Sequence, residues 1–311
     1  MIHRSDVAVI GAGPAGMTAA LYLARSGCSV MMFEQLTPGG QILQTEGLEN
    51  YPGFPNGVKG YELADYMNAQ LAPYDIARPL GEISGITGSA GAFVLRAEAG
   101  QDTYETRAVI VCSGVFHKHL GLPGENRLLG HGVSYCALCD GNFYRNQPVA
   151  VVGGGNSALE ESLYLAKIAS QVHLIHRRDE FRGDMIYQKK LEQLGDKVII
   201  HRSAVIEELE GDKDLNGLVI RDVKTNETSS IMVNGLFIYV GFIPSTKFLP
   251  EGAETDAQGF LVTDTEMRTS IPGIFAAGDV RSKMCRQVIT AAGDGATAAH
   301  AAFVFLEHLD A

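Results

Sequence analysis

The sequence contains the same glycine-rich pattern twice, and this repeat constrains the fold more than any other feature. The first copy is GAGPAG at residues 11–16, after the apolar run Val7–Ile10, and the second is GGGNSA at residues 153–158, after Val149–Val152. A helix-like stretch and another apolar run follow each copy. Strand, glycine turn, helix and strand form the βαβ unit that binds dinucleotides. We therefore expect an α/β protein with two Rossmann-like dinucleotide-binding domains.

The first copy ends in an acid. We expect a helix over residues 17–25 and a second strand over residues 28–33, which Glu34 closes. Glu34 follows Gly11 by 23 residues, where a carboxylate can accept hydrogen bonds from ribose hydroxyls. The glycines permit the turn and the close approach of a pyrophosphate to the backbone. Turn-rich segments at residues 38–41 and 48–53 carry polar side chains placed to reach a ligand.

The second copy ends in basic residues instead. Gly153 and His176 are also 23 residues apart, and Arg177 and Arg178 follow directly. A carboxylate at this position would repel a 2′-phosphate, whereas guanidinium groups pair with it in a bidentate way. The second site is therefore predicted to hold NADPH rather than NADH, and Arg182 adds to the cluster. The alternative is a solvated basic turn after a strand.

The end of the chain points back to the first glycine turn. Residues 269–279 form an apolar strand that ends in Gly278-Asp279, before a helix predicted over residues 287–309. Asp279 can bind sugar or ribityl hydroxyls, and the helix N-terminus can face a phosphate. If this turn shares a site with Gly11, the first domain is discontinuous. It then comprises residues 1–117 and 247–311, with a domain of residues 118–246 inserted through paired, hinge-like linkers.

A Cys-x-x-Cys pair, Cys136 and Cys139, stands 17 residues ahead of the second glycine motif, and Asp140 follows it. A zinc site would need two further ligands, and no second cysteine pair offers them. Two buried thiols could also stand together by accident. A redox pair fits best beside two nucleotide sites, because this spacing lets the sulfurs close and reopen a disulfide. Asp140 is then a proton donor or acceptor, or else a turn residue before Gly141.

Composition excludes several other classes of protein. The chain of 311 residues suits two domains, and its net charge of −11 argues against nucleic acid or an anionic membrane as a partner. Five cysteines are too few and too sparse for a secreted disulfide framework. The uncharged stretch from residue 7 to 24 approaches transmembrane length, but its glycines and proline divide it into strand, turn and helix. No signal peptide precedes it, so we expect a cytoplasmic protein with no membrane or metal site.

These motifs together resemble the low-molecular-weight, bacterial-type thioredoxin reductases of the pyridine nucleotide–disulfide oxidoreductase superfamily. The resemblance covers essentially the whole chain. It rests on GAGPAG, PGGQ at residues 38–41, CALCD at residues 136–140, GGGNSA, HRRDEFR at residues 176–182 and FAAGD at residues 275–279, with Arg286-Gln287 beyond. The chain departs from the family pattern at Asn142, where an aromatic residue is frequent, and at Gly183, where alanine is usual.

The resemblance implies an NADPH-dependent thioredoxin disulfide reductase. FAD occupies the first site and NADPH the second, and electrons pass from NADPH to FAD, to the Cys136–Cys139 disulfide and then to thioredoxin. By family pattern Cys139 lies nearest the flavin, Cys136 attacks the disulfide of thioredoxin, and Asp140 is the acid–base residue. The inserted domain rotates between two orientations, and the enzyme is a homodimer.

The resemblance and the motifs also define two sets of cofactor contacts. The predicted FAD contacts are Gly11, Gly13, Pro14, Ala15, Gly16, Glu34, Gln35, Gly40, Gln41, Asn50, Gly278, Asp279, Arg286, Gln287 and Val288. The predicted NADPH contacts are Gly153, Gly155, Asn156, Ser157, His176, Arg177, Arg178 and Arg182.

Three other functions are compatible with parts of the sequence. A reductase that feeds a peroxiredoxin or glutaredoxin-like protein usually carries an extra N-terminal redox domain, whereas this sequence starts at the flavin motif. A related ferredoxin–NADP reductase would lack the dithiol. A redox-sensing nucleotide-binding protein with little turnover is the alternative from outside enzymology, and steady-state NADPH consumption with a disulfide substrate separates it from a reductase.

Overall fold

The computed structural model describes residues 1–44, 47–48, 50–98 and 102–311, and these form two compact units. The first unit combines Met1–Gln44, Tyr51–Phe116 and Ile243–Ala311. The second is built mainly from His117–Phe242. Each unit contains one copy of the glycine-rich repeat and has its own sheet and core.

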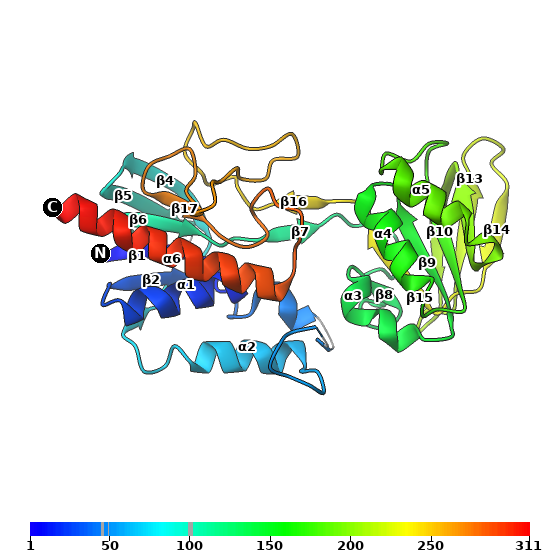
Figure 1. Cartoon of the computed structure of the whole chain (residues 1–311), viewed down its shortest axis with the longest axis horizontal. Coiled ribbons are helices and arrows are strands. Elements are labelled where there is room, and N and C mark those ends of the chain that lie inside the picture. The colour runs from blue at the N-terminus through cyan, green and yellow to red at the C-terminus, as the bar shows by residue number, and fades with distance from the viewer. Residues whose placement is uncertain (45–46, 49, 99–101) are drawn as a thin grey trace. The chain divides into compact units, whose positions relative to one another are not determined.

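A seven-stranded sheet forms the first unit (Figure 1). Its strands are β1 (Ile2–Ile10), β2 (Val30–Phe33), β3 (Ile76–Ala77), β4 (Ile83–Ser89), β5 (Ala92–Ala97), β6 (Thr103–Val111) and β17 (Ile274–Ala276). The order is β3-β2-β1-β6-β5-β4. Along β6, Thr103–Thr106 pair with antiparallel β5 and Val109–Val111 with parallel β17. The last strand thereby ends beside the glycine turn that follows β1.

Helices cover this sheet. They are α1 (Pro14–Arg25), α2 (Gly60–Ala69) and α6 (Val288–Asp310), with a 3-10 turn at Gly40–Gln44. Figure 1 shows α1 and α6 side by side along the sheet. Gly295 allows this contact, because a Cβ atom there would lie 2.2 Å from the carbonyl oxygen of Ala15. Among the described residues α6 alone has the length and apolar composition to cross a membrane, but here it packs on α1 and β6 as a core helix does.

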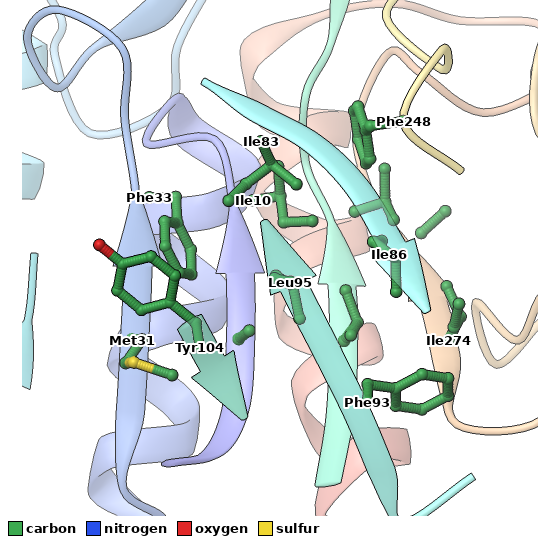
Figure 2. Packing of buried hydrophobic residues seen from close by; sticks show 14 of the residues in the cluster. Ile10, Met31, Phe33, Ile83, Ile86, Phe93, Leu95, Tyr104, Phe248 and Ile274 are labelled. Carbon is green, nitrogen blue, oxygen red and sulfur yellow. The ribbon is translucent and has the colours of Figure 1, made fainter. Parts of the chain in front are cut away.

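The other face of the sheet carries the core shown in Figure 2. Ile10, Phe33 and Leu95 from three strands meet there, and Phe248 joins them from the segment after residue 244. The ring of Phe33 meets Tyr104 edge-on at 4.9 Å between centroids, a favoured aromatic geometry. Burying the first strand on both faces explains why Val7–Ile10 is apolar without alternation.

The second unit repeats this plan. A parallel sheet has the order β11-β10-β9-β15-β8, and a three-stranded antiparallel sheet has the order β12-β13-β14. The strands are β8 (Val133–Ser134), β9 (Pro148–Gly153), β10 (Gln171–His176), β11 (Val198–Arg202), β12 (Ala204–Glu210), β13 (Gly217–Asp222), β14 (Thr228–Ile231) and β15 (Gly235–Tyr239). The helices are α3 (Ala137–Asp140), α4 (Asn156–Leu165) and α5 (Met185–Glu192), and 3-10 turns cover Gly141–Tyr144 and Gly195–Lys197.

Two apolar clusters lie on opposite faces of this parallel sheet. Val149 and Val151 belong to the cluster beneath α4, whereas Ala150 and Val152 belong to the cluster beneath β12 and β13. Successive residues of a strand point to opposite faces, so a strand covered on both sides needs a continuous apolar run. In both units the strand before the glycine turn lies between two parallel neighbours, β2 and β6 around β1 and β10 and β15 around β9. The expected α/β class with two Rossmann-like sheets is confirmed.

The segment His117–Phe242 is joined to the first unit at both of its ends, and the two connections pair with each other. β7 (Val115–His117) and β16 (Phe242–Pro244) form a two-stranded sheet. The backbone N–H of Lys118 also donates to the carbonyl oxygen of Gly241 at 2.9 Å. Both connections are therefore hydrogen-bonded segments rather than open loops.

The helix after the first glycine motif begins earlier than the sequence predicts, and the helix after the second motif begins inside that motif. α1 begins at Pro14 rather than at residue 17, because proline has the backbone angle of a first helical residue and lacks only an N–H that would be unpaired there. The last glycine of the motif is thus inside the helix. α4 likewise begins at Asn156.

Candidate active site and nucleotide-binding turns

The two cysteines of the CALC segment form a disulfide at the start of the short helix α3. Cys136 caps this helix, and its Cα lies 5.3 Å from that of Cys139. The N–H of Cys139 donates to the sulfur of Cys136 at 3.2 Å. One helical turn therefore brings the two sulfurs within bonding distance. A donor aimed at Cys136 would also stabilise its thiolate after reduction.

Asp140 is connected to the backbone of Cys136 through Ser134. The buried hydroxyl of Ser134 donates to Asp140 Oδ2 at 2.6 Å and accepts from the N–H of Cys136 at 3.0 Å. This pair of hydrogen bonds orients the carboxylate within the cysteine turn. Ser134 is not among the site residues predicted from the sequence, in which its position two residues before the first cysteine is the only sign of its role.

Tyr239 supports the cysteine turn from the neighbouring strand. Its hydroxyl oxygen accepts the N–H of Ala137 at 2.6 Å. Burial, and then the charges of Glu161 and Asp140, raise the pKa of Tyr239, so the phenol stays neutral. Tyr239 also pairs with Gly153 across β15 and β9. Tyr239 thus contacts both the dithiol segment and the second glycine turn. It lies 102 positions after Ala137 in the sequence.

Glu161, on α4, is a second carboxyl group in this region. Burial, and then the charge of Glu160, raise its pKa to about 7. Its Oε2 atom is buried and has no hydrogen-bond partner among the described residues. Neither Glu161 nor Tyr239 belongs to a motif, so sequence reasoning had no pattern by which to find them.

The first glycine turn has no room for side chains. A Cβ atom on Gly16 would lie 1.8 Å from the carbonyl oxygen of Gly11, and one on Gly11 would lie 2.4 Å from that of Cys112. Gly11 has φ +105°, which favours glycine. Because α1 starts at Pro14, its free N–H groups and positive dipole end face the turn, where a pyrophosphate would bind.

Several predicted FAD contacts gather at this turn. Glu34 points back to it, with Oε2 accepting the N–H of Ala12 at 3.0 Å and Oε1 accepting that of Gln35 at 2.8 Å.

Gly40 lies against Gly13, because a Cβ atom on Gly40 would be 3.2 Å from the Gly13 Cα. The amide of Gln41 donates to the carbonyl of Val115. Asn50 is exposed, and its contact with FAD stays a prediction.

The Gly278–Asp279 turn meets the same glycine turn from the other end of the chain. A Cβ atom on Gly278, which has φ +81°, would lie 2.9 Å from the Cβ of Ala15. Burial raises the pKa of Asp279, and the charge of Lys283 opposes this increase. Gln287 is the residue directly before α6, which begins at Val288, and the side chain of Arg286 donates to the carbonyls of Asp279, Arg281 and Lys283. The first glycine turn and the Gly278–Asp279 turn, which are far apart in the sequence, therefore lie together.

The second glycine turn is held by the basic loop that follows β10. The N–H groups of Arg182 and Gly183 both donate to the carbonyl of Gly154, at 2.8 and 3.0 Å. This loop carries the exposed side chains of Arg177 and Arg178, and Arg182 is exposed beside the turn. Gly183 departs from the family pattern where space is short, since an added Cβ atom would lie 2.5 Å from Leu159 Cδ1.

Two predicted NADPH contacts have structural partners. His176 is buried beneath the turn, where a Cβ atom on Gly154 would touch its ring at 2.2 Å, and burial lowers its pKa. Its position favours support of the turn over direct contact with a phosphate. The amide of Asn156 makes reciprocal hydrogen bonds with Asp184, the residue that precedes α5. Ser157 is exposed in the first turn of α4, beside Gly155.

Within the described ranges no cluster of three or more histidine, cysteine or acidic side chains could hold a metal ion. Cys112 is buried, and burial raises the pKa of its thiol. The disulfide pair and the two glycine turns thus remain the main chemical features.

Comparisons with known proteins agree with this geometry. The family model for pyridine nucleotide-disulphide oxidoreductases matches residues 5–295. A thioredoxin reductase from Listeria monocytogenes is 44% identical, covering 98% of this chain and 94% of the relative. One from Treponema pallidum is 41% identical, with 98% of each chain covered.

Solved structures give the same result. Thioredoxin reductase from Streptococcus pyogenes matches with a TM-score of 0.90 and 42% identity, over 98% of this chain and 99% of that one. The enzyme from Giardia duodenalis matches with a TM-score of 0.91 and 32% identity over the same shares. The chain therefore belongs to the pyridine nucleotide-disulphide oxidoreductase family, among the thioredoxin reductases.

Proposed function

We propose that this flavoprotein uses NADPH to reduce the disulfide of thioredoxin through Cys136 and Cys139. The observation that carries the proposal is the Cys136–Cys139 disulfide, with Asp140 tied to it through Ser134. This disulfide lies in the same compact unit as the second glycine turn and the basic loop that carries the arginine cluster. A reducible pair, an acid–base group and a nucleotide site are the parts that such a reductase needs.

The residues present fit the two cofactors of the family. FAD fits the Gly11–Gly16 turn, where backbone N–H groups at the start of α1 meet a pyrophosphate and Glu34 and Asp279 accept from hydroxyl groups. NADPH fits the Gly153–Ala158 turn, with Arg177, Arg178 and Arg182 on its 2′-phosphate. When bound, these cofactors supply the two electrons that reduce the disulfide.

Reduction of the disulfide gives one thiol and one thiolate, and the chain holds the groups that stabilise them. The N–H of Cys139 is aimed at the Cys136 sulfur, which favours a thiolate there and its role as the attacking nucleophile. Cys136 breaks the disulfide of thioredoxin and forms a mixed disulfide. Cys139 then attacks Cys136, which releases reduced thioredoxin and restores the starting disulfide. Asp140 donates and accepts the protons of these steps.

Exposed apolar side chains flank the dithiol and suit a protein substrate. Leu138 is 37% exposed and Phe143 is 48% exposed, and both lie within a few residues of Cys139. Asn142 lies between them in the 3-10 turn, and the side chain of Arg145 donates to its amide oxygen at 3.0 Å. We assign this surface to thioredoxin, with Asn142 as the position that adapts it to the partner of this enzyme.

The remaining features follow the family. We assign FAD to residues 1–117 and 247–311 and NADPH to residues 118–246, an assignment that the division into compact units supports. The protein is proposed to be a cytoplasmic homodimer that acts without nucleic acid or a membrane.

The test is NADPH oxidation by the purified yellow protein, with and without thioredoxin. We expect flavin bleaching on anaerobic addition of NADPH, and thioredoxin-dependent turnover that Cys136→Ser abolishes and Cys285→Ser, an exposed control, retains. Bleaching without turnover on thioredoxin would contradict the proposed partner and direct attention to another disulfide substrate. Turnover that survives in Cys136→Ser would contradict the proposed role of the dithiol.

A further inference from the structure

A network of charged side chains lies directly behind the Gly278–Asp279 turn. Asp294, on α6, accepts the N–H of Gly278 at 3.1 Å and pairs with Arg281 at 2.9 Å and with Lys283 at 3.1 Å. The Nζ atom of Lys283 also lies 3.1 Å from Asp279 Oδ1. The side chains of Arg281, Lys283 and Asp294 are only 10–14% exposed. These interactions are therefore shielded from water and stronger than surface pairs.

The two oxygens of Asp279 have different surroundings. Oδ1 is buried and accepts no well-directed hydrogen bond within the described part of the chain, but the Lys283 ammonium group is its ionic partner. The side chain as a whole is nevertheless 27% exposed. Lys283 thus holds Oδ1, while part of the Asp279 side chain stays accessible to a ligand.

We propose that Lys283 and Asp294 are positioning residues for the flavin, which act by holding Asp279 in the orientation that binds hydroxyl groups of FAD. This inference rests on the proposed function, in which Asp279 contacts FAD. Lys283 connects the two carboxylates, and Asp294 anchors Lys283 to α6 while it also holds the Gly278 backbone. Neither residue lies in a glycine motif or among the cofactor contacts that the sequence predicts.

The physical reason is the cost of a buried charge without its partner. Removal of the Lys283 ammonium leaves Asp279 in a desolvated position, because burial is the largest influence on its pKa and the Lys283 charge is the main opposing one. The carboxyl group then takes up a proton or rotates toward water. Either change removes the held acceptor and weakens flavin binding.

The test measures the rate at which the holoenzyme releases FAD, followed by the rise of flavin fluorescence after dilution. Lys283→Met is expected to release FAD at least about tenfold faster than the unsubstituted protein, the loss expected for one charged hydrogen-bonding partner. Lys283→Arg keeps the cation and should restore most of the retention. Lys224→Met is the matched control, because Lys224 pairs with Asp179 at an exposed site in the other unit.

A second variant keeps the test decisive if Lys283→Met folds poorly. Asp294→Asn retains an acceptor for the Gly278 N–H but loses the charge that holds Lys283, and it too should release FAD faster. A purely structural network would lower the unfolding temperature of each variant and leave FAD release below that temperature unchanged, which would overturn the inference.

Asp279→Asn separates this inference from the proposed function. If Asp279→Asn speeds FAD release and neither Lys283→Met nor Asp294→Asn does, the positioning role is wrong and the contact of Asp279 with FAD stands. If Asp279→Asn itself leaves release unchanged, the contact assigned to Asp279 is wrong, and the positioning role is overturned with it.

Discussion

The two glycine turns share a backbone plan and differ in what the following strand presents to them. In the first, the Glu34 carboxylate accepts the N–H of Ala12 at the turn itself. In the second, the corresponding position holds His176, whose ring is buried beneath Gly154, and the exposed charges are the arginines that follow. The glycine pattern thus specifies the turn, whereas we propose that the residues at the end of the next strand select the nucleotide.

The backbone plan that the two glycine turns share should be disrupted most severely by a substitution at Gly16. Gly16→Ala would place a Cβ atom 1.8 Å from the Gly11 carbonyl oxygen, so the turn must deform. We expect a protein that loses its FAD and is destabilised by about 3 kcal/mol or more, the range of severe overpacking. Flavin absorbance after purification and urea unfolding would measure both effects.

Gly293→Ala is the matched control within the same unit. Gly293 lies inside α6, and apart from its chain neighbours and the adjacent helix backbone no atom of the described residues lies within 4 Å of where its Cβ would be. Alanine favours a helix over glycine by about 1 kcal/mol, so this variant should be as stable as the unsubstituted protein or more so. A Gly16→Ala protein that keeps FAD and normal stability would show that the turn is not sterically closed.

Substitutions in the basic loop after β10 test the feature that distinguishes the two glycine turns. Arg177→Ala combined with Arg178→Ala should raise the KM for NADPH by about 30-fold or more, because charged hydrogen bonds contribute about 1.5–3 kcal/mol each. The KM for NADH should change little. Steady-state kinetics with both nucleotides give the answer, and Arg127→Ala, an exposed arginine of the same unit, serves as the control. Equal increases for NADH and NADPH would contradict recognition of the 2′-phosphate.

A smaller effect distinguishes the second strands of the two repeats. β2 contains only buried apolar residues, whereas β10 contains His173, which stacks on His201 with 3.0 Å between ring nitrogens. Burial, and then the His201 charge, lower the pKa of His173 to about 4. Protons then bind preferentially to the unfolded chain, so stability is complete above about pH 6.5 and declines as the pH falls toward about 4.

His173→Leu isolates this contribution from that of His117, whose pKa burial also lowers to about 4. As the pH falls from about 7.5 to 5, the free energy of unfolding of the variant should rise by on the order of 1 kcal/mol relative to that of the unsubstituted protein. Urea unfolding at the two pH values measures the difference. If the two proteins differ in unfolding free energy by the same amount at both pH values, His173 titrates normally in the fold.

Much of the fold could be predicted because local patterns decide it. An apolar run such as Val149–Val152 indicates a strand covered on both faces, and the glycines after it indicate a turn with no space for side chains. The sequence pattern places the start of α1 three residues late, because the motif glycines resemble a loop before the helix. The helix propensity of single residues does not reveal that Pro14 begins it.

The site could be predicted only where its residues lie close together in the sequence. Cys136, Cys139 and Asp140 form one segment, so their proximity follows from their spacing. The hydroxyl of Tyr239 reaches Ala137 only because β15 lies beside β9 and β8 in the sheet, and the sequence gives no sign of this contact. The same limit explains why the link between Asp294 and Lys283 appears only in the structure.

The most direct test of the account is an anaerobic reductive titration of the holoenzyme with dithionite. If both the flavin and the Cys136–Cys139 disulfide accept electrons, the protein should take up about two equivalents of two-electron reductant per chain. Cys136→Ser should take up about one, because only the flavin remains reducible. Uptake of a single equivalent by the unsubstituted protein would contradict a dithiol that exchanges electrons with the flavin.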